Sequence, residues 1–375
     1  IDYSPYSGAG TCGHWLFEPQ STQTATYSND FTQGDIFVTS SDPSVQKIVL
    51  TSQQTISPDG TNNAWKMVDD NDGLTSVTGF NYFGVRVIAN NYNTISYFVK
   101  KQGSNNFVYI AINGLDASAN GTTFFDIQNG TLGNVSANHT ANIENYGNGW
   151  YRISITVQTV TDIQGAFSLR LATSNGTQNI LRDGTNGIYF FGVQAESDVS
   201  RQFMTSYIPT SGSTVTRNQE AAFGSGNSSL ISSTEGTLYA EIAALADDNI
   251  ARNISLGNGI NIANTVEIFY NTGSQSINFR VRANNSVVGS VSGGSVTDRT
   301  QFAKVAIKYK SGEIKGFING LQVLSITDSF TFSASLSKLA FDRGSGSDKF
   351  EGKTKCVAVF KEALTDDELE CLTSD

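Results

Sequence analysis

Residues 205–218 read TSYIPTSGSTVTRN, and this stretch lies between two long blocks of alternating apolar and polar residues. Ser, Thr, Gly and Pro dominate it, so it offers little apolar surface to bury. Similar composition continues for some residues beyond it, which predicts a linker over residues 205–234. A chain of 375 residues is long enough for one domain on each side of such a linker.

The block before the linker predicts one β-sandwich over residues 28–204. Its clearest strand, residues 149–157, reads GWYRISITV and follows the turn pair Asn148-Gly149. A second pair, Asn129-Gly130, favours a type I′ hairpin turn. Short strands at intervals of about 8–12 residues with such turns are typical of a sandwich or jelly roll.

The block after the linker predicts a second sandwich over residues 235–375. Residues 236–242 and 277–282 alternate as strands do. Near the end, Thr365 is followed three residues later by Glu368, the spacing of a helix capping box. The sequence therefore predicts an all-β protein with two β-sandwich (jelly-roll) domains, a Ser/Thr/Gly linker and one short C-terminal helix.

The first 27 residues lack clear periodicity and are interpreted as an N-terminal arm. Trp15, Leu16 and Phe17 give this arm an apolar cluster. Because the sandwich at residues 28–204 follows directly, we expect the cluster to pack the arm onto that first domain. The chain begins at Ile1 and not at Met, so the sequence leaves open whether an anchoring domain precedes it.

The composition restricts the partners. A net charge of −10 and a pI of about 4.7 repel phosphate backbones, which argues against nucleic-acid binding. No run of 18 apolar residues is present, so no membrane span is expected. Charged residues make up only 15%, so the surface is mostly amide and hydroxyl groups. Such a surface suits hydrogen bonding to sugars, or an inert extracellular coat.

Several strings resemble bacteriophage proteins. The T-S-Y-I-P-T-x-G-x-x-V-T-R-N string resembles the join between β-domains in phage tail-fibre and virion surface proteins. The opening D-Y-S and later L-F-E-P-Q resemble the start of the same modules, although S-T-Q-T replaces the usual R-T-N. Residues 57–61 and 64–70, the G-N-G-W-Y-R strand and the G-V-Q-A-E string resemble the carbohydrate-binding-module-like jelly rolls of phage fibres.

The second block resembles laminin-G/concanavalin-A-like sandwiches. The resemblance lies in the K-Y-x-x-G-x-x-x-x-F-I-N-G arrangement at residues 308–320 and in the ending at residues 350–369. Together the resemblances imply a non-enzymatic fibre or decoration protein at the extracellular virion surface. They imply that it binds host cell-surface polysaccharide, contacts other virion proteins and forms a homotrimer, although no heptad run holds three chains together.

Two other functions are weighed against this one. A polysaccharide lyase or glycoside hydrolase on the same fold needs a cleft with a Tyr or His base beside Arg and Gln or Asn. The R-x-E-x-R and Q-[IV]-H strands of jelly-roll alginate lyases are absent, and neither His14 nor His139 has zinc-ligand spacing. The third reading is a purely structural virion appendage, which a missing aromatic or calcium-lined groove would favour.

The aromatic candidates for sugar stacking are chosen by context. Tyr82, Tyr92 and Tyr146 lie in stretches rich in Asn and Gly, so we predict that they are exposed and bind glycan. Trp150 lies in the middle of a predicted strand and Trp65 in an apolar stretch, so both are expected in the core.

Two acidic turns are candidates for calcium. Asp69, Asp70 and Asp72 place three carboxylates within four residues, and calcium takes several such oxygens at about 2.3–2.6 Å. Asp342 and Asp348 flank a second turn. The alternative for both is an ordinary Asp/Asn/Gly loop, because neither completes an EF-hand.

Overall fold

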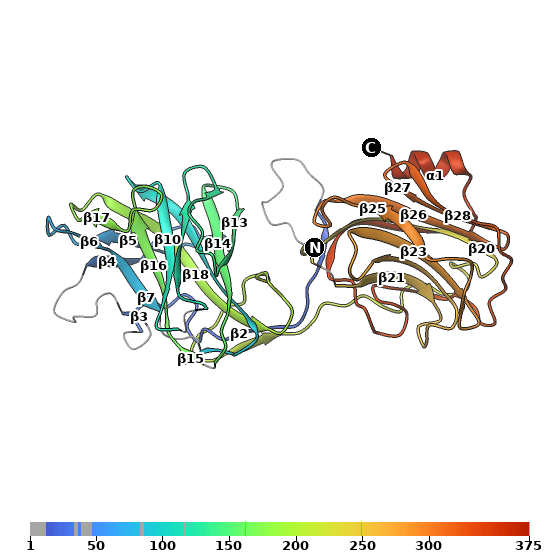
Figure 1. Ribbon diagram of the computed structural model, residues 1–375, viewed down its shortest axis with the longest axis horizontal. Helices are drawn as coiled ribbons and strands as arrows, with labels where there is room; N and C mark the ends of the chain where they lie inside the picture. Colours follow the sequence, from blue (N-terminus) through green and yellow to red (C-terminus); the bar gives the residue numbers. More distant parts are fainter. Residues whose placement is uncertain are drawn as a thin grey trace. The chain divides into compact units, whose positions relative to one another are not determined.

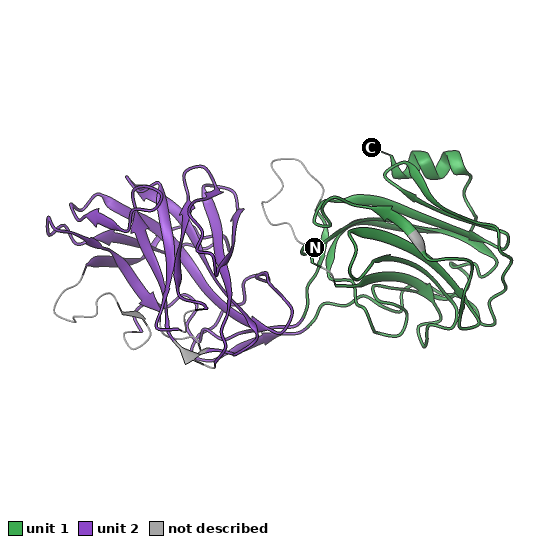
Figure 2. Cartoon of the chain, in the orientation of Figure 1, with its two compact units in different colours: residues 1–3, 10–19, 219–375 green, residues 4–9, 20–218 purple. Residues whose placement is uncertain are grey.

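The computed structural model describes residues 13–374 except 34–36, 39–46, 83–85, 116–117, 162 and 249. The regular secondary structure of the described chain is β-strand apart from one short helix, as predicted. It forms two compact units, shown in different colours in Figure 2. Unit 1 holds residues 13–19 and 219–374, and unit 2 holds residues 20–218, so unit 2 is inserted into the sequence of unit 1.

Unit 2 is built from two six-stranded antiparallel sheets (Figure 1). Sheet A has, in spatial order, β12 (Thr131–Leu132), β11 (Gly121–Asp126), β10 (Phe107–Asn113), β16 (Ala166–Ala172), β7 (Gly79–Tyr82) and β3 (Phe37–Val38). Sheet B has β13 (Thr140–Asn145), β14 (Trp150–Gln158), β9 (Tyr92–Gly103), β18 (Asn186–Asp198), β5 (Ala64–Asp69) and β4 (Ile48–Thr55). Three small ribbons complete the unit: β15 (Ile163–Gln164) with β8 (Arg86–Val87), β17 (Asn179–Leu181) with β6 (Thr75–Val77), and β19 (Val215–Arg217) with β2 (Ser21–Gln23).

The core of unit 2 follows from the two-residue period of its strands. On β9, Ile95, Tyr97 and Val99 enter the core that both sheets share. The neighbour Phe98 belongs to a separate aromatic cluster with Trp150, which identifies the outer face of sheet B. Trp150 is buried, as predicted, but on this outer face and not in the core between the sheets.

Unit 1 is a second sandwich. One sheet has β1 (Trp15–Phe17), β30 (Gly352–Phe360), β20 (Glu235–Ala244), β26 (Ala303–Lys310), β27 (Glu313–Ile318) and β28 (Leu321–Ile326). The other has β24 (Ser286–Val287), β23 (Ser276–Ala283), β22 (Thr265–Tyr270), β21 (Arg252–Gly257) and β29 (Lys338–Ala340), with β25 (Ser292–Ser295) paired to β23. No helix within the described ranges is long and apolar enough to span a membrane.

The helix α1 (Asp366–Thr373) confirms the predicted capping box. The Thr365 hydroxyl accepts the backbone N–H of Glu368, whose carboxylate accepts the backbone N–H of Thr365. The buried Leu369 packs against the sheet, and the Lys308 ammonium lies 2.9 Å from the Asp366 carboxylate. The helix therefore covers the outer face of the six-stranded sheet of unit 1.

Asn-Gly pairs form type I′ turns at two places. Asn148 and Gly149 have φ of 51° and 80°, and Asn319 and Gly320 have φ of 47° and 79°. The predicted type I′ turn at Asn129-Gly130 is wrong. Only the glycine has positive φ there, and the loop from β11 to β12 has four residues, of which Gln128 and Asn129 donate their backbone amides to the Asp126 carboxylate.

The N-terminal arm differs from its prediction. Trp15–Phe17 pair with Gly352–Thr354 of β30, so they belong to unit 1 and not to the first sandwich. The physical reason is aromatic packing, since the Phe17 ring stacks on Phe341 with centroids 4.3 Å apart. Residues 1–12, with the D-Y-S string, lie outside the described residues.

The predicted linker is also wrong over residues 205–218, which belong to unit 2. Residues 201–210, named the strap here, lie on the outer face of sheet B. The Thr205 carbonyl accepts hydrogen bonds from Arg152 (2.7 Å) and Gln194 (3.1 Å), and the Thr205 amide donates to Glu196 (2.9 Å). Backbone groups of Thr205, Ser206 and Ile208 bond to the buried polar side chains of this face, a role that composition alone does not reveal.

The strap and β18 together fix the segment that begins unit 2. The Gln23 amide donates to the Val193 carbonyl (2.9 Å), and its oxygen accepts from the Ala195 amide (2.7 Å). The Ser28 hydroxyl accepts from the Tyr207 hydroxyl (2.7 Å) and from the backbone of Thr210 (2.8 Å). Both ends of unit 2 are therefore tied to sheet B.

We expect Thr205→Val to lower the free energy of unfolding of unit 2 by about 1.5–3 kcal/mol, because a buried carboxylate loses a hydrogen bond. The Thr205 hydroxyl is buried and donates to Glu196 at 2.5 Å. Unit 2 holds Trp65 and Trp150, so urea unfolding followed by fluorescence in a Trp15→Phe background reports on this unit alone. The control Thr51→Val lies at an exposed position of β4 and should change little. Equal stability of the two variants would contradict the role of the strap.

Candidate functional site

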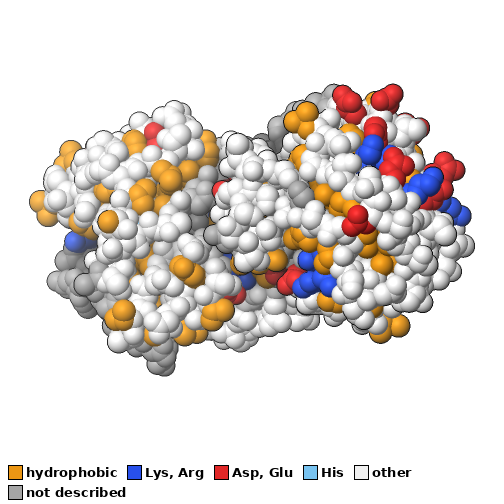
Figure 3. Space-filling model, turned by 45° about the vertical axis from the view of Figure 1, so that its right-hand side comes forward, with side chains coloured by type: hydrophobic (Ala, Val, Ile, Leu, Met, Phe, Trp, Pro, Cys, Tyr) orange, Lys and Arg blue, Asp and Glu red, His pale blue; other side chains and the backbone are white. Residues whose placement is uncertain are grey.

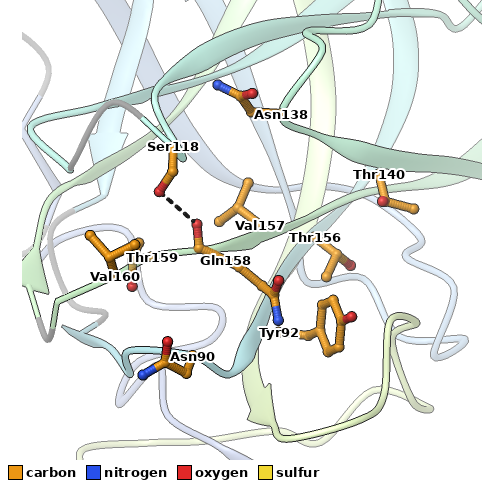
Figure 4. A pocket seen from close by; sticks show the side chains of 10 residues that line it. All are labelled: Asn90, Tyr92, Ser118, Asn138, Thr140, Thr156, Val157, Gln158, Thr159 and Val160. Atoms are coloured by element: carbon orange, nitrogen blue, oxygen red, sulfur yellow. Dashed lines mark hydrogen bonds between the residues drawn. The ribbon is translucent and has the colours of Figure 1, made fainter.

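A cavity of about 400 Å³ lies at one end of the strands β9 and β14 in unit 2 (Figure 4). β14 supplies Thr156–Gln158 and the two residues after it, whereas β9 begins at Tyr92 and β13 at Thr140. We name it the Tyr92 pocket, and its lining residues are Asn90, Tyr92, Ser118, Asn138, Thr140, Thr156, Val157, Gln158, Thr159 and Val160.

The described lining of the Tyr92 pocket combines two valines with amide and hydroxyl side chains, and it carries no charge. The Ser118 hydroxyl donates to the Gln158 carbonyl (3.2 Å), which joins the two sides of the pocket. The buried Thr159 hydroxyl makes no hydrogen bond to any described residue. Amide and hydroxyl groups both donate and accept, which matches the hydroxyl groups of a neutral sugar. Tyr92, half-buried, adds one aromatic ring to the lining, and its role in glycan binding stays a prediction.

His139 supports the wall of this pocket and does not act as a ligand. It lies between the lining residues Asn138 and Thr140 and is buried. Its Nδ1 lies 2.9 Å from the Thr123 hydroxyl and its Nε2 lies 3.0 Å from the Ala119 carbonyl oxygen. Burial lowers the pKa of His139 below its ordinary value of 6.5, with the Ala119 bond opposing in part.

We expect the stability of unit 2 to fall as the pH drops below about 6.5, because the unfolded chain then takes up a proton that buried His139 resists. Above that pH both states hold a neutral imidazole and the effect vanishes. The unfolding midpoint of the Trp15→Phe chain between pH 7.5 and 5 measures it. His139→Gln should flatten the profile, and an unchanged slope in that variant would refute the assignment to this residue.

Tyr146 lines a second cavity of about 350 Å³, which we name the Tyr146 pocket. Its ring meets Phe98 edge to face at 4.8 Å, and the pocket also includes Lys100, near the opposite end of β9 from Tyr92. The structure therefore places Tyr92 and Tyr146 in separate pockets of one sheet. The prediction for Tyr82 is wrong, because alternation along β7 directs its ring into the core, where it is fully buried.

The structure does not assemble the predicted calcium site at Asp69, Asp70 and Asp72. The Arg182 guanidinium lies between the last two, with both oxygens of Asp70 at 2.7 Å and with Asp72 in contact. Asp69 is buried and accepts hydrogen bonds from the amide of Gly184 and the Asn186 side chain. An arginine occupies the position that a cation would need.

The second acidic turn is likewise used by the protein. The Asp342 carboxylate accepts the Gly344 amide, and the Asp348 carboxylate lies 3.3 Å from the Arg343 guanidinium. Among the described residues no group of three His, Cys, Asp or Glu side chains is placed to hold a metal ion. The calcium prediction for Asp342 and Asp348 therefore has no support in the geometry.

A tyrosine and an arginine do meet on the outer face of sheet A, as a lyase would require. Tyr109 pairs with Arg170 across β10 and β16, and Arg170 contacts Asn81. However, Tyr109 is almost fully buried, its hydroxyl donates to the Gln178 carbonyl, and burial raises its pKa to about 12. A general base needs the opposite shift of pKa, so this group lacks the arrangement for proton abstraction.

Sequence reasoning found Tyr92 but missed the rest of its pocket. The missed residues come from separate segments near positions 90, 118, 138 and 158, which only the fold brings together. One signal was available. The string TVQTV at residues 156–160 breaks the alternation of β14, because Thr159 stands where an apolar residue is expected, and its last residue, Val160, is 69% exposed.

The match to a family of known proteins concerns mainly unit 1. Residues 216–370 match the family model of the Concanavalin A-like lectin/glucanases superfamily. Unit 1 therefore carries a lectin-like fold, which confirms that part of the predicted resemblance. No curated protein matches the sequence.

Three solved structures show similarity to part of the chain. The CBM40 of the Ruminococcus gnavus IT-sialidase is 18% identical with a TM-score of 0.35, covering 42% of this chain and 97% of its own. The heptameric SAP-like pentraxin of Limulus polyphemus is 11% identical with a TM-score of 0.33, covering 40% and 74%. The NanB sialidase of Streptococcus pneumoniae is 16% identical with a TM-score of 0.32, covering 38% and only 25%. Similarities this low identify no ligand for this chain.

Proposed function

We propose that this chain is a non-enzymatic bacteriophage surface protein, a fibre or decoration component, that binds host cell-surface polysaccharide. The observation that carries the proposal is the uncharged Tyr92 pocket, where hydroxyl and amide groups surround one aromatic ring. Its volume of about 400 Å³ lies in the range of ligand sites, roughly 300–1,000 Å³.

Two further features support glycan binding. Unit 1 matches a lectin and glucanase superfamily over residues 216–370. On the face in Figure 3, most acidic and basic side chains lie on unit 1, and unit 2 shows few of them. A neutral polar surface exchanges hydrogen bonds with sugar hydroxyls without the cost of removing charges from water.

The phage role rests on the resemblance of the strings, and the structure gives those strings a common physical basis. Arg152 of the G-N-G-W-Y-R string and Gln194 of the G-V-Q-A-E string both bond to Thr205 of the T-S-Y-I-P-T string. Strings that are distant in sequence thus form one hydrogen-bonded module. A module of this kind is what the resemblance to phage fibres implies for unit 2.

The proposal includes assembly and location. Binding at one polar pocket is weak, and a homotrimer on the virion surface would strengthen it through effective concentration. The same surface position would bring the chain into contact with other virion proteins. Light scattering on the purified chain measures its mass, and a monomer at all concentrations would remove the trimer from this proposal.

We expect a polysaccharide array to show binding by the whole chain that EDTA does not change. Gln158→Ala and Tyr92→Ala should weaken it at least about tenfold, because each removes a pocket contact worth about 1.4 kcal/mol or more. Gln322→Ala, an exposed amide on β28 of unit 1, is the matched control for Gln158→Ala. Direct titration by calorimetry gives the affinities.

Three outcomes would contradict the proposal in different ways. If a folded, oligomeric chain binds no polysaccharide, a purely structural role as a virion appendage is the remaining function. New reducing ends or unsaturated products would instead show a lyase or glycoside hydrolase. Binding that survives both pocket variants would place the site elsewhere in the chain.

A further inference from the structure

The Tyr146 pocket differs from the Tyr92 pocket in one respect, since its lining includes a lysine. Lys100 lies on the outer face of sheet B, paired with Trp150 on β14 and with Tyr189 on β18. Its ammonium lies 6.0 Å from the centre of the Trp150 ring. Its stem runs beside the type I′ turn, because a Cβ placed on Gly149 would meet Lys100 Cε at 3.5 Å. The cation is thus held at an aromatic wall.

The Lys100 ammonium makes neither a hydrogen bond nor an ion pair with any described residue. The next residue along β9 shows the contrast, because the Lys101 ammonium bonds to the oxygens of Asn106 (2.6 Å) and Gln128 (2.5 Å). Lys101 therefore joins the segments that carry Asn106 and Gln128, whereas the charge of Lys100 is available to a ligand. A half-buried cation that has neither a hydrogen bond nor an ion pair favours an anionic ligand.

The rest of the pocket is fixed before any ligand arrives. The Trp150 indole N–H donates to the Ile56 carbonyl (3.1 Å), and the Tyr146 ring is held edge-on by Phe98. The Ile56 side chain is 61% exposed and forms an apolar side of the pocket. A preformed wall of this kind lowers the entropy lost on binding.

We propose that the Tyr146 pocket binds a sugar residue that carries a carboxylate. Lys100 pairs with the carboxylate, Tyr146 and Ile56 contact the apolar face of the ring, and the Asn148 amide bonds to its hydroxyls. The inference rests on the proposed glycan-binding function and adds a second class of sugar to it. Because the chain has a net charge of −10, its overall field repels anions, and selection for an acidic sugar has to arise locally at Lys100.

The two pockets lie near opposite ends of the β9–β14 pair, so one polysaccharide strand could present a neutral residue to Tyr92 and an acidic residue to Lys100. This arrangement predicts a preference for polysaccharides that contain both kinds of residue. Neither pocket alone would give that preference.

The test uses the whole chain and matched pairs of sugars. The methyl glycosides of glucuronic, galacturonic and mannuronic acid are each compared with the neutral parent glycoside by calorimetry and NMR titration. At least one acid should bind about three- to tenfold more tightly than its parent at low salt, and the difference should shrink in 0.5 M NaCl. Lys100→Gln should abolish the difference and Lys100→Arg should retain it. Lys361→Gln removes one exposed charge from unit 1 and should have no effect.

The outcomes separate this inference from the proposed function. Equal affinity for every acid and its parent, or a preference for acids that survives in Lys100→Gln, overturns the inference. If neutral parents still bind and Gln158→Ala weakens them, the proposed function stands without this second site. If no sugar of either kind binds, on the array or in titration, the proposed function fails together with the inference. Retention in Lys100→Arg shows that loss in Lys100→Gln reflects the charge and not the fold.

Discussion

The buried guanidinium of Arg152 is the interaction on which unit 2 depends. It lies on the outer face of sheet B, fully buried, 5.0 Å from the Phe98 ring, with hydrogen bonds to the Ser96 hydroxyl and the Thr205 carbonyl. Burial alone would lower the pKa of this group, but Tyr146, Glu196 and Glu144 around it raise it. A charge in such a place requires partners on every side, and the strap supplies those that sheet B lacks.

The same requirement explains the site. Tyr146 both contacts Phe98 and interacts with Arg152, so the aromatic wall of its pocket is held by the network under the strap. Glu196 continues that network toward Ser21 and Arg201. The strands that carry the two pockets are therefore held by hydrogen bonds and ion pairs on the outer face of sheet B and by apolar packing on its inner face.

The sequence was sufficient for the features that depend on local patterns. Alternation identified strands such as β14 and β23, and the Thr365–Glu368 spacing identified α1, because each depends on neighbours in the chain. The sequence was insufficient for features that depend on contacts between residues far apart in the chain. Nothing local shows that Arg182 comes between Asp70 and Asp72, or that Phe17 stacks on Phe341. Tyr82 and Tyr92 have similar Asn-rich neighbours in the sequence. Only the register of their strands places Tyr82 in the core and Tyr92 in the wall of a pocket.

The pairing of β1 with β30 also bears on how the chain is made. A ribosome delivers β1 before unit 2 and β30 after it. Unit 2 is complete after Asn218 and is free to fold at once, whereas the edge of the lectin-like sheet waits for the last strand. During synthesis, Trp15–Phe17 would thus remain an apolar segment without its partner strand, a period in which nascent chains are most exposed to mispairing with one another.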